Sequence, residues 1–364
     1  MSIFKRKFYK FSKQFGTYIK KNLYSKNILK TKFSKSLFHF SSYIIFEKKY
    51  NYQKKTKKID IILWPIWGDK FYKYFLDYCL PSLMQEGNLL WLIKQYNVEF
   101  DLYYRKNIKT LKNDKNINYL VNKTSCKVNF IDCEKIFEKS EKSPMLIIFK
   151  SHIIKSLINK SLSIQILADL VYSKDSFKNL LSTIHGKNYC YTFTHARVNN
   201  NTSVKSLLKH HRKKRMYNVI DINSKKLVSL AGKNLTETMK FQDDKLEKNL
   251  THTGVSYRKI NKKFVTVVNL LHPYICNFEP EDLDYFNKMK LFTETDRAFP
   301  SYLFMKSRLK VITSSNILFA VELTDNIKVK KNQLVKQLYN DQKLNQHNIA
   351  AYIFNSIINV WEEE

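Results

Sequence analysis

The amino-acid sequence predicts an α/β protein with a doubly wound, mainly parallel sheet. Between residues 59 and 198, apolar strand-like runs alternate with helix-like segments. This order favours parallel pairing, because parallel neighbours need a long crossover connection that is usually a helix. The chain has 364 residues, of which 44% are hydrophobic and 14% aromatic, so it is long and apolar enough to bury a full core.

The first half of the main domain supplies most of this alternation. IDIILWPIWG is typical of a buried strand that ends in a turn, and a helix follows in which Pro81 introduces a kink or an end. EGN, at 86–88, predicts a turn. We expect strands at 59–68, 98–105, 126–133, 168–173 and 188–198, and helices at 69–85, 144–166 and, capped by Gly186, 174–186.

The second half of the chain is less regular. The basic segment 202–215 predicts a helix, and so does 224–241, with Ser224 as its N-cap. The segments 263–280 and 308–323 are rich in strand-forming residues. Helices are expected to close the chain at 333–342 and 348–364.

Residues 1–58 form a distinct basic segment with no acidic residue before Glu47. Spacings of three and four place four aromatic side chains on one helical face, with lysines around the rest: Phe4, Phe8, Phe11 and Phe15. A basic amphipathic helix of this kind can lie on an anionic membrane surface. The alternatives are a helix packed on the protein's own body, or a tail.

These observations divide the chain into three parts. A basic amphipathic extension covers 1–58, the main α/β domain covers 59–330, and C-terminal helices that pack on the core cover 331–364. No apolar run reaches the roughly 20 residues that span a bilayer, and lysines interrupt the N-terminus too often for a signal peptide. Five cysteines form no CxxC pair, which predicts neither a disulfide framework nor a zinc ribbon. We expect a cytoplasmic protein, with the extension at the inner face of a membrane.

The formal net charge is +33. It favours an anionic partner, such as nucleic acid, acidic lipid or a phosphorylated substrate. The alternative is an AT-rich coding bias, because lysine greatly outnumbers arginine, the residue that reads phosphates and bases best. The densest basic cluster, KHHRKKR at 209–215, carries no accompanying nucleic-acid signature, so we do not expect nucleic acid as the partner. GxSxG, GxGxxG and P-loop motifs are all absent from the sequence.

One stretch carries a family resemblance. WPIWGDKFYKYFLDYCLPSLMQEGNL, at 64–89, resembles the opening of an uncharacterised bacterial family similar to glycosyltransferases of the GT-A type. ADLVYSKDSF, the His-Pro of LLHPYI and FTETDRAF match later stretches of that family in the same order, so the resemblance covers about 60–330. It implies a GT-A-like, Rossmann-like fold and sugar transfer from a nucleotide-sugar donor to a surface-polysaccharide or glycolipid acceptor.

Ligands of open α/β sheets sit beyond the carboxyl ends of the strands. The segments expected there include WGDK at 67–70 and SKDS at 173–176. Asp69 could contact the donor or cap the following helix, and Trp67 could stack on a base or pack in the core. We expect the donor to be bound by residues from these segments: Trp67, Gly68, Asp69, Ser173 and Asp175.

A diphosphate carries charge that a divalent cation can neutralise, and Mg²⁺ or Mn²⁺ prefers carboxylate oxygens. Glu294 and Asp296 point the same way in an extended chain, so both can meet one ion. The resemblance implies that this pair, with His272 from the His-Pro motif, holds the metal. Alternatively the acids are ordinary surface charges and His272 a histidine at a strand end. The pair departs from the usual Asp-x-Asp, which puts metal dependence in question.

The sequence therefore predicts a glycosyltransferase but assigns no catalytic base. Two alternatives from other classes stay open. One is a non-enzymatic basic protein that binds nucleic acid or an anionic membrane. The other is a transferase fold without activity, which the single carboxylate of Ser173-Lys174-Asp175 allows.

Overall fold

In the computed structural model of the protein, two compact units are separate: Met1–Lys54 with Lys135–Glu141, and Lys55–Glu134 with Lys142–Glu364. The sheets below belong to the second unit. The predicted extension, up to residue 56, and the predicted helix at 333–342 lie outside the described residues. The structure describes residues 57–139, 143–184, 189–193, 195–236, 255–260, 263–268, 274–289, 299–300, 302–303, 305–312, 314–325 and 358–362.

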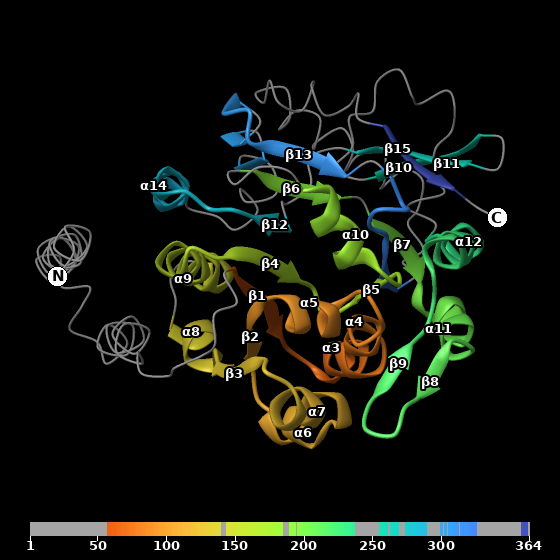
Figure 1. The fold of residues 1–364 in the computed structure, drawn as a ribbon, viewed down its shortest axis with the longest axis horizontal. Helices are drawn as coiled ribbons and strands as arrows, with labels where there is room; N and C mark the ends of the chain where they lie inside the picture. The colour runs from red at the N-terminus through yellow and green to blue at the C-terminus, as the bar shows by residue number, and fades with distance from the viewer. Residues whose placement is uncertain are drawn as a thin grey trace, which may run out of the picture. The chain divides into compact units, whose positions relative to one another are not determined.

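Seven strands among the described residues form one central sheet, in the order β13-β6-β12-β4-β1-β2-β3 (Figure 1). Within this sheet, β12 runs antiparallel to both of its neighbours, and every other neighbouring pair is parallel. The predicted mainly parallel α/β sheet is thus confirmed. The strands are β1 (Lys58–Ile66), β2 (Asn97–Tyr104), β3 (Lys127–Asp132), β4 (Leu162–Ile166), β6 (Cys190–Phe193), β12 (Ile275–Cys276) and β13 (Leu309–Ile312).

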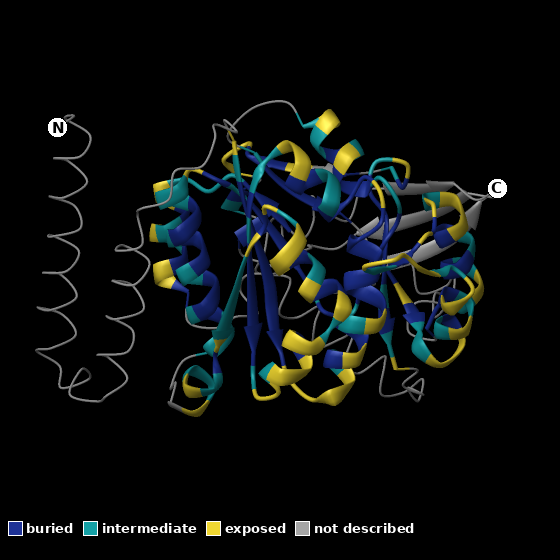
Figure 2. Ribbon diagram, turned by 60° about the horizontal axis from the view of Figure 1, so that its bottom comes forward, coloured by how far each residue is buried: buried dark blue, intermediate teal, exposed yellow. Residues whose placement is uncertain are grey.

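Helices cover both faces of this sheet, as the alternation of side chains along β1 requires. Ile61 and Leu63 pack into the core with the helices that follow β1. Trp64 points to the opposite face and stacks on Phe149 of α9, with ring centroids 5.4 Å apart. Figure 2 shows the strands as a buried layer between helices whose outer sides are exposed. The helices are α3 (Asp69–Tyr74), α4 (Leu80–Leu83), α5 (Leu89–Gln95), α6 (Ile108–Asn113), α7 (Lys115–Lys123), α9 (Pro144–Asn159), α10 (Ser176–Thr183) and α14 (Pro280–Lys288). Another helix, α8 (Glu134–Lys139), follows β3 along the chain and belongs almost entirely to the first unit.

The helix after β1 continues through Pro81 because the turn before the proline is π-helical. Phe75–Cys79 forms a π-helical turn, η2, between α3 and α4, and Pro81 lies in the first turn of α4. A proline ring clashes with the carbonyl four residues earlier, here that of Asp77, and cannot donate to it. A π-turn bonds five residues apart and relieves that conflict. The predicted kink at Pro81 is therefore a local change of helix type.

The predicted helix at 144–166 is wrong in its last part. α9 ends at Asn159, and Leu162–Ile166 forms β4, the direct neighbour of β1. Lys160 takes a left-handed conformation, with φ 51°, and Ser161 donates to the carbonyl of Ser156 at 3.1 Å. This helix end carries no glycine or proline, so composition did not reveal it. The alternation of LSIQI was the signal available.

A second, smaller sheet stands beside the central one, in the order β5-β14-β7. β14 (Ala320–Thr324) runs parallel to β7 (His195–Asn199) and antiparallel to β5 (Leu170–Tyr172). The predicted strand 188–198 is therefore two strands, β6 and β7, in different sheets. The strand-rich segment 308–323, for which one or two strands were predicted, contains two, β13 and β14.

Two further corrections concern predicted helices. The segment 202–215 is helical only in α11 (Asn200–Leu208), and its basic end joins a hairpin of β8 (His211–Lys213) and β9 (Asn218–Ile220). Ile358–Glu362, predicted as the end of a helix, forms β15 and pairs with β11 (Lys263–Val268), which also pairs with β10 (Val255–Ile260). Ile, Val and Trp favour strands, and the partner strand decided the outcome.

The helix predicted from Ser224 is confirmed as α12 (Ser224–Asn234), with a shift of its cap. Asn223 is the N-cap residue, and its side chain accepts from the amide of Lys226 at 2.9 Å. The Ser224 hydroxyl instead donates to the carbonyl of Ser315 at 2.6 Å, and so joins α12 to the segment before β14. The last part of the predicted range, from residue 237 to 241, lies outside the described residues.

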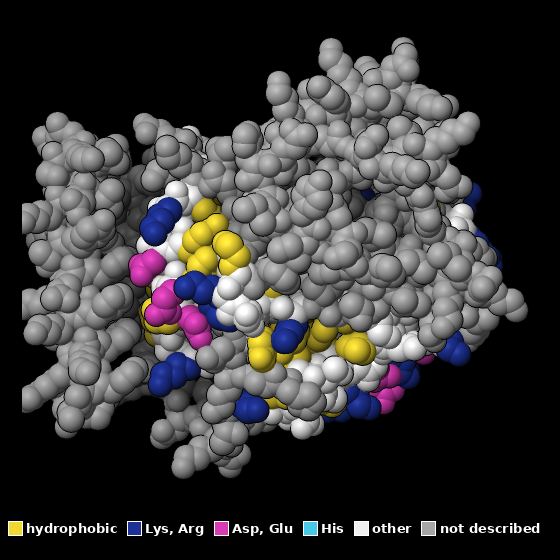
Figure 3. All heavy atoms as spheres, turned by 90° about the horizontal axis from the view of Figure 1, so that it is seen from above, with side chains coloured by type: hydrophobic (Ala, Val, Ile, Leu, Met, Phe, Trp, Pro, Cys, Tyr) yellow, Lys and Arg dark blue, Asp and Glu magenta, His cyan; other side chains and the backbone are white. Residues whose placement is uncertain are grey.

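α14 is fixed to the central sheet by a buried arginine. The guanidinium of Arg308 binds Asp282 of α14, with Nη1 2.6 Å from Oδ1, and also donates to the carbonyl of Asn277 at 2.8 Å. Glu281 and Asp284 of this helix are exposed, and Figure 3 shows acidic and basic side chains close together on the face of the molecule seen from above. No helix in the described part of the chain is both long and apolar enough to cross a membrane.

Residue 87 requires glycine for two reasons: its backbone has a positive φ, and a side chain would have no room. Gly87 has φ +76°, and a Cβ there would come within 2.0 Å of Asp175 Oδ1 and 2.5 Å of Asp175 Cα. Gly68 has nearly the same φ, +75°, but a Cβ on it would meet nothing within 4 Å. The two positions therefore separate conformational strain from a steric clash.

We expect Gly87→Ala to lower the free energy of unfolding by about 2–3 kcal/mol, measured by urea denaturation. Gly68→Ala is the control for a positive φ without crowding: its backbone, at φ 75° and ψ 147°, is strained for alanine, but its Cβ meets no neighbouring atom, so the loss should be smaller than at Gly87. Equal losses in the two variants would show that Asp175 does not crowd Gly87.

Candidate functional site

The carboxyl ends of β1 and β2 form the first part of the candidate site. Because the two strands are parallel neighbours, the residues that follow them meet at one edge of the sheet. Gly68 turns the chain out of β1 and serves as the N-cap of α3. Asp69 is the first residue of that helix, and its Oδ1 lies 3.5 Å from Nδ2 of Asn107, in the loop after β2.

The loop after β2 is held in an unusual backbone conformation. Lys106 and Asn107 both have positive φ, 59° and 53°. The hydroxyl of Tyr72 lies 3.0 Å from the carbonyl oxygen of Arg105 and 2.6 Å from that of Lys106, so its one hydrogen is shared between them. Consecutive left-handed residues are costly unless their surroundings hold them, and such strain is common at ligand sites.

Trp67 and Asp69 are placed where the sequence predicted. Trp67 is 42% exposed and packs at a tilt against Phe71, with ring centroids 5.6 Å apart. Asp69 is exposed and does not cap α3, because Gly68 occupies the cap and no side chain completes it. Of the two alternatives for Asp69, the cap is therefore wrong. Contact with a donor stays a prediction for Trp67, Gly68 and Asp69.

Ser173 and Asp175 lie apart from the loops after β1 and β2, next to the 86–88 turn. Ser173 is buried, its hydroxyl is 2.8 Å from that of Ser176, and its carbonyl accepts from Nδ2 of Asn88 at 2.9 Å. Asp175 has φ 61°, begins α10 as its N-cap and donates its amide to the carbonyl of Glu86 at 3.1 Å. These contacts are structural, and donor binding by either residue stays a prediction.

The predicted metal ligands Glu294, Asp296 and His272 lie outside the described residues. Among the residues that are described, no three His, Cys, Asp or Glu side chains are placed to hold a metal ion together. The described residues therefore do not supply a ligand set for Mg²⁺ or Mn²⁺, and the metal stays a prediction.

The sequence did not single out an ionisable cluster at the second, smaller sheet. Glu322 of β14 accepts a hydrogen bond at Oε2 from Nε2 of His195, at 2.5 Å, and another from Nε of Arg197, at 3.2 Å. In register, Glu322 lies opposite Arg197, and His195 is two residues earlier on the same face of β7. The amide of Leu323 donates to the carbonyl of Asp169 at 2.9 Å, which brings Asp169 to this cluster.

The pKa values of the two carboxylates are driven apart. Burial, and then the negative charge of Glu322, raise the pKa of Asp169 to about 7. Burial acts on Glu322 in the same direction, but the hydrogen bond and charge of His195, with the charge of Arg197, outweigh it and lower the pKa of Glu322 to about 2. Asp169 therefore exchanges a proton near neutral pH beside a permanently charged neighbour, which is how enzymes prepare a general base.

Asp169 follows β4 by three residues, and β4 is the parallel neighbour of β1. Its carboxylate is therefore at the same edge of the sheet as Gly68 and Asp69. Lys70, in the first turn of α3, is close enough for its positive charge to act on Asp169. Lys70 thus connects the loop after β1 with the ionisable cluster.

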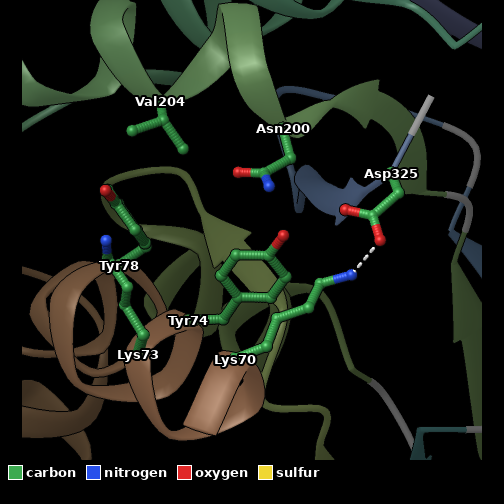
Figure 4. Close-up of a pocket in the computed structure, with 7 residues that line it drawn as sticks. All are labelled: Lys70, Lys73, Tyr74, Tyr78, Asn200, Val204 and Asp325. Carbon is green, nitrogen blue, oxygen red and sulfur yellow. Dashed lines mark hydrogen bonds and ion pairs between the residues drawn. The ribbon is translucent and has the colours of Figure 1, made fainter.

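Lys70 also lines a cavity of about 240 Å³ (Figure 4). Figure 4 shows side chains of α3 and η2 on one side, those of α11 on the other, and Asp325, just after β14, at the end. The ammonium of Lys70 forms an ion pair with Asp325 across it. The lining residues are Lys70, Lys73, Tyr74, Tyr78, Asn200, Val204 and Asp325.

The wall of the cavity combines charge with aromatic surface. Burial and the nearby carboxylate of Asp325 raise the pKa of Tyr74 to about 12, so its hydroxyl is protonated at neutral pH. The hydrogen bond from Lys70 lowers the pKa of Asp325, so that residue is ionised. Hydroxyl, carboxylate, amide and ring surfaces together suit a ligand rich in hydroxyl groups.

A signal for the ionisable cluster was present in the sequence. His195 and Arg197 alternate with apolar residues in THARV, and Glu322 interrupts the apolar run of FAVEL. A charge in a strand core is costly unless it is paired. Each of these charged residues therefore implied a partner of opposite charge or a hydrogen-bond partner. Only the pairing of β7 with β14 showed which residue that partner is. Comparison of the chain with protein-family models and with curated proteins gave no match.

Proposed function

We propose that the protein is a glycosyltransferase with a GT-A-like core, which transfers a sugar from a nucleotide-sugar donor to a glycan or glycolipid acceptor. The observation that carries the proposal is the convergence of Asp69, Asn107 and Asp169 at one edge of a parallel sheet, after β1, β2 and β4. This edge is where open α/β sheets bind their ligands.

The sheet itself supports the GT-A assignment. Its strands run parallel apart from β12, which lies between β4 and β6. A mainly parallel sheet flanked by helices is compatible with the Rossmann-like, GT-A-like fold that the resemblance at 64–89 implies. This support concerns the fold, and the activity rests on the site.

The donor is assigned to the edge at β1 and β2. The exposed ring of Trp67 offers a face on which a nucleobase can stack. Asp69 and Asn107 together offer an acceptor and a donor for the two hydroxyls of a ribose. Lys106 is exposed in the same loop, and its charge attracts the diphosphate.

The acceptor is assigned to the cavity of Figure 4, with Asp169 as the general base. In this scheme Asp169 takes the proton of an acceptor hydroxyl while that oxygen forms a bond to the anomeric carbon of the donor. The bond from that carbon to the diphosphate breaks, and the nucleoside diphosphate leaves with the electron pair. A single displacement of this kind inverts the anomeric centre.

Thermal unfolding with a panel of nucleoside diphosphates and nucleotide-sugars, with and without Mn²⁺, tests donor binding. A donor at about a hundred times its Kd should add roughly 2.7 kcal/mol to the stability, which is visible as a rise in melting temperature. We expect a rise with one nucleobase series, and we expect the double variant Asp69→Ala/Asn107→Ala to lose it.

The matched control is Asp284→Ala/Asn234→Ala, which removes an exposed carboxylate on α14 and an amide on α12. It should keep the full rise in melting temperature. If no nucleotide raises the melting temperature of the unaltered protein, the donor assignment is wrong, and the non-enzymatic alternative is favoured.

A further inference from the structure

The hairpin of β8 and β9 presents a compact cationic tip, formed by Arg212, Lys213, Lys214, Arg215 and Met216, all of them exposed. The amide of Lys214 donates to the carbonyl of Tyr217 at 2.8 Å and closes the turn. Figure 1 shows the loop between β8 and β9 at the lower edge of the view, beyond the ends of both strands. We call these five residues the hairpin tip.

The hairpin is anchored to α7 from behind. The side chain of Asn116 bonds the backbone of Asn218 in both directions, accepting at 2.6 Å and donating at 3.1 Å. Tyr217 packs on Tyr119 with ring centroids 4.5 Å apart. These contacts hold the base of the hairpin, so the tip does not have to be ordered when it meets a partner.

The charges of the hairpin tip have no acidic partner in the described part of the chain. Among the described residues, no carboxylate lies within ion-pair distance of Lys213, Lys214 or Arg215. Arg212 donates to the carbonyls of Lys209 and His211, at 2.8 and 3.0 Å, which stiffens the turn without cancelling its charge. Four adjacent cations produce a strong local field that favours an anionic partner.

Met216 indicates which anionic partner fits. It is 41% exposed at the end of the four cations, where a polar residue would serve a purely electrostatic contact. A flexible apolar side chain among cations matches the boundary between phospholipid headgroups and acyl chains. The nearest aromatic ring of the hairpin, Tyr217, is half-buried and packs at a tilt on Tyr119, so it is a poorer platform for stacking bases than an exposed ring would be.

We propose that the hairpin tip docks the protein on an anionic phospholipid surface, with the cations at the headgroups and Met216 in the outer acyl region. This docking does not depend on the proposed sugar transfer. It is also separate from any contact made by residues 1–58.

Co-sedimentation of the full-length protein with vesicles tests the proposal. Each basic residue near an anionic surface strengthens partitioning by roughly fivefold, so three together give roughly a hundredfold. With phosphatidylcholine vesicles containing phosphatidylglycerol, we expect Lys213→Gln/Lys214→Gln/Arg215→Gln to partition roughly a hundredfold more weakly than the unaltered protein. Met216→Ser should weaken partitioning by roughly fivefold, with less dependence on salt.

The matched control is Lys178→Gln/Lys225→Gln/Lys288→Gln. It removes the same charge from three exposed lysines on α10, α12 and α14. It should partition within about threefold of the unaltered protein, since its charges lie away from the hairpin. Equal partitioning of the two triple variants would overturn the proposal. So would loss of binding to a single-stranded RNA in the hairpin variant with vesicle binding unchanged, which would assign the tip to nucleic acid.

Discussion

Asp169→Asn is expected to lower the rate of nucleoside diphosphate release from the donor by roughly 10²–10⁴-fold, which is the usual contribution of a general base. Donor binding should persist, because the nucleoside is assigned to Asp69 and Asn107. The rate is measured with the nucleotide-sugar that thermal unfolding identifies, using water or an added glycan as the acceptor. Asp284→Asn, an exposed acid on α14, is the control and should leave the rate unchanged.

The same assignment predicts the pH dependence of the rate. Asp169 acts as a base only when it is deprotonated, and burial together with the charge of Glu322 raises its pKa to about 7. The rate should therefore increase with pH through about 7. Glu322→Gln removes the neighbouring negative charge, so the midpoint of that increase should move to lower pH. An unchanged rate in Asp169→Asn, or a profile indifferent to Glu322, would remove Asp169 from the role of base.

Lys155→Met is expected to have the largest effect on stability. Lys155, on α9, is buried between two acids of β2, with Nζ 2.6 Å from Oδ2 of Asp101 and 3.1 Å from Oε2 of Glu99. Removing one partner of a buried ion pair typically costs about 3–5 kcal/mol, because the remaining charge stays buried without compensation. Urea unfolding should show this loss, and Lys94→Met, an exposed lysine on α5, should show almost none.

The acid side of the stability curve gives an independent check. Burial would raise the pKa of Glu99, but Lys155 and Lys58 outweigh it and lower that pKa to about 2. Since the folded pKa lies below the ordinary value of 4.5, Glu99 contributes stability above that value, and the contribution is lost as the pH falls toward 2. In Lys155→Met the folded pKa of Glu99 should lie closer to 4.5, so the acid-dependent loss of stability should be smaller and should end at a higher pH. A variant with unchanged stability and unchanged acid unfolding would show that the ion pair is not formed in solution.

The predictions for Asp169 and Lys155 concern carboxylates of the same sheet that have different roles. Near the amino ends of β1 and β2, the carboxylates of Asp60, Glu99 and Asp101 are bound by lysine, serine and asparagine side chains. Near the carboxyl end of β4, Asp169 stands beside a second negative charge that raises its pKa. Carboxylates that are paired with lysine or with hydrogen-bond donors help to hold the fold together, whereas one that faces a second negative charge is available for chemistry.

Part of the fold was predictable because local pattern and tertiary role agree. The apolar runs that became β1 and β2 are buried in a parallel sheet, and such strands are predicted directly from their sequence. The edge of the sheet at Gly68 and Asp69 followed from the same reasoning. The end of α9 at Asn159 did not, because a left-handed lysine terminates it where a glycine would have been the usual signal.

The sequence by itself determined the class of the fold, the start of the site after β1 and the excess of positive charge. Only the tertiary structure decided that THARV and FAVEL are neighbouring strands, which pairs Glu322 with His195 and Arg197 and raises the pKa of Asp169. It also decided that the basic segment after α11 is a hairpin with an exposed tip. The pairing of β8 with β9 is itself local, but the hairpin is held by Asn116 of α7, which lies 102 residues before Asn218. Periodicity and composition act within a few residues, whereas the pairing of strands and the mutual effect of buried charges depend on segments more than a hundred residues apart.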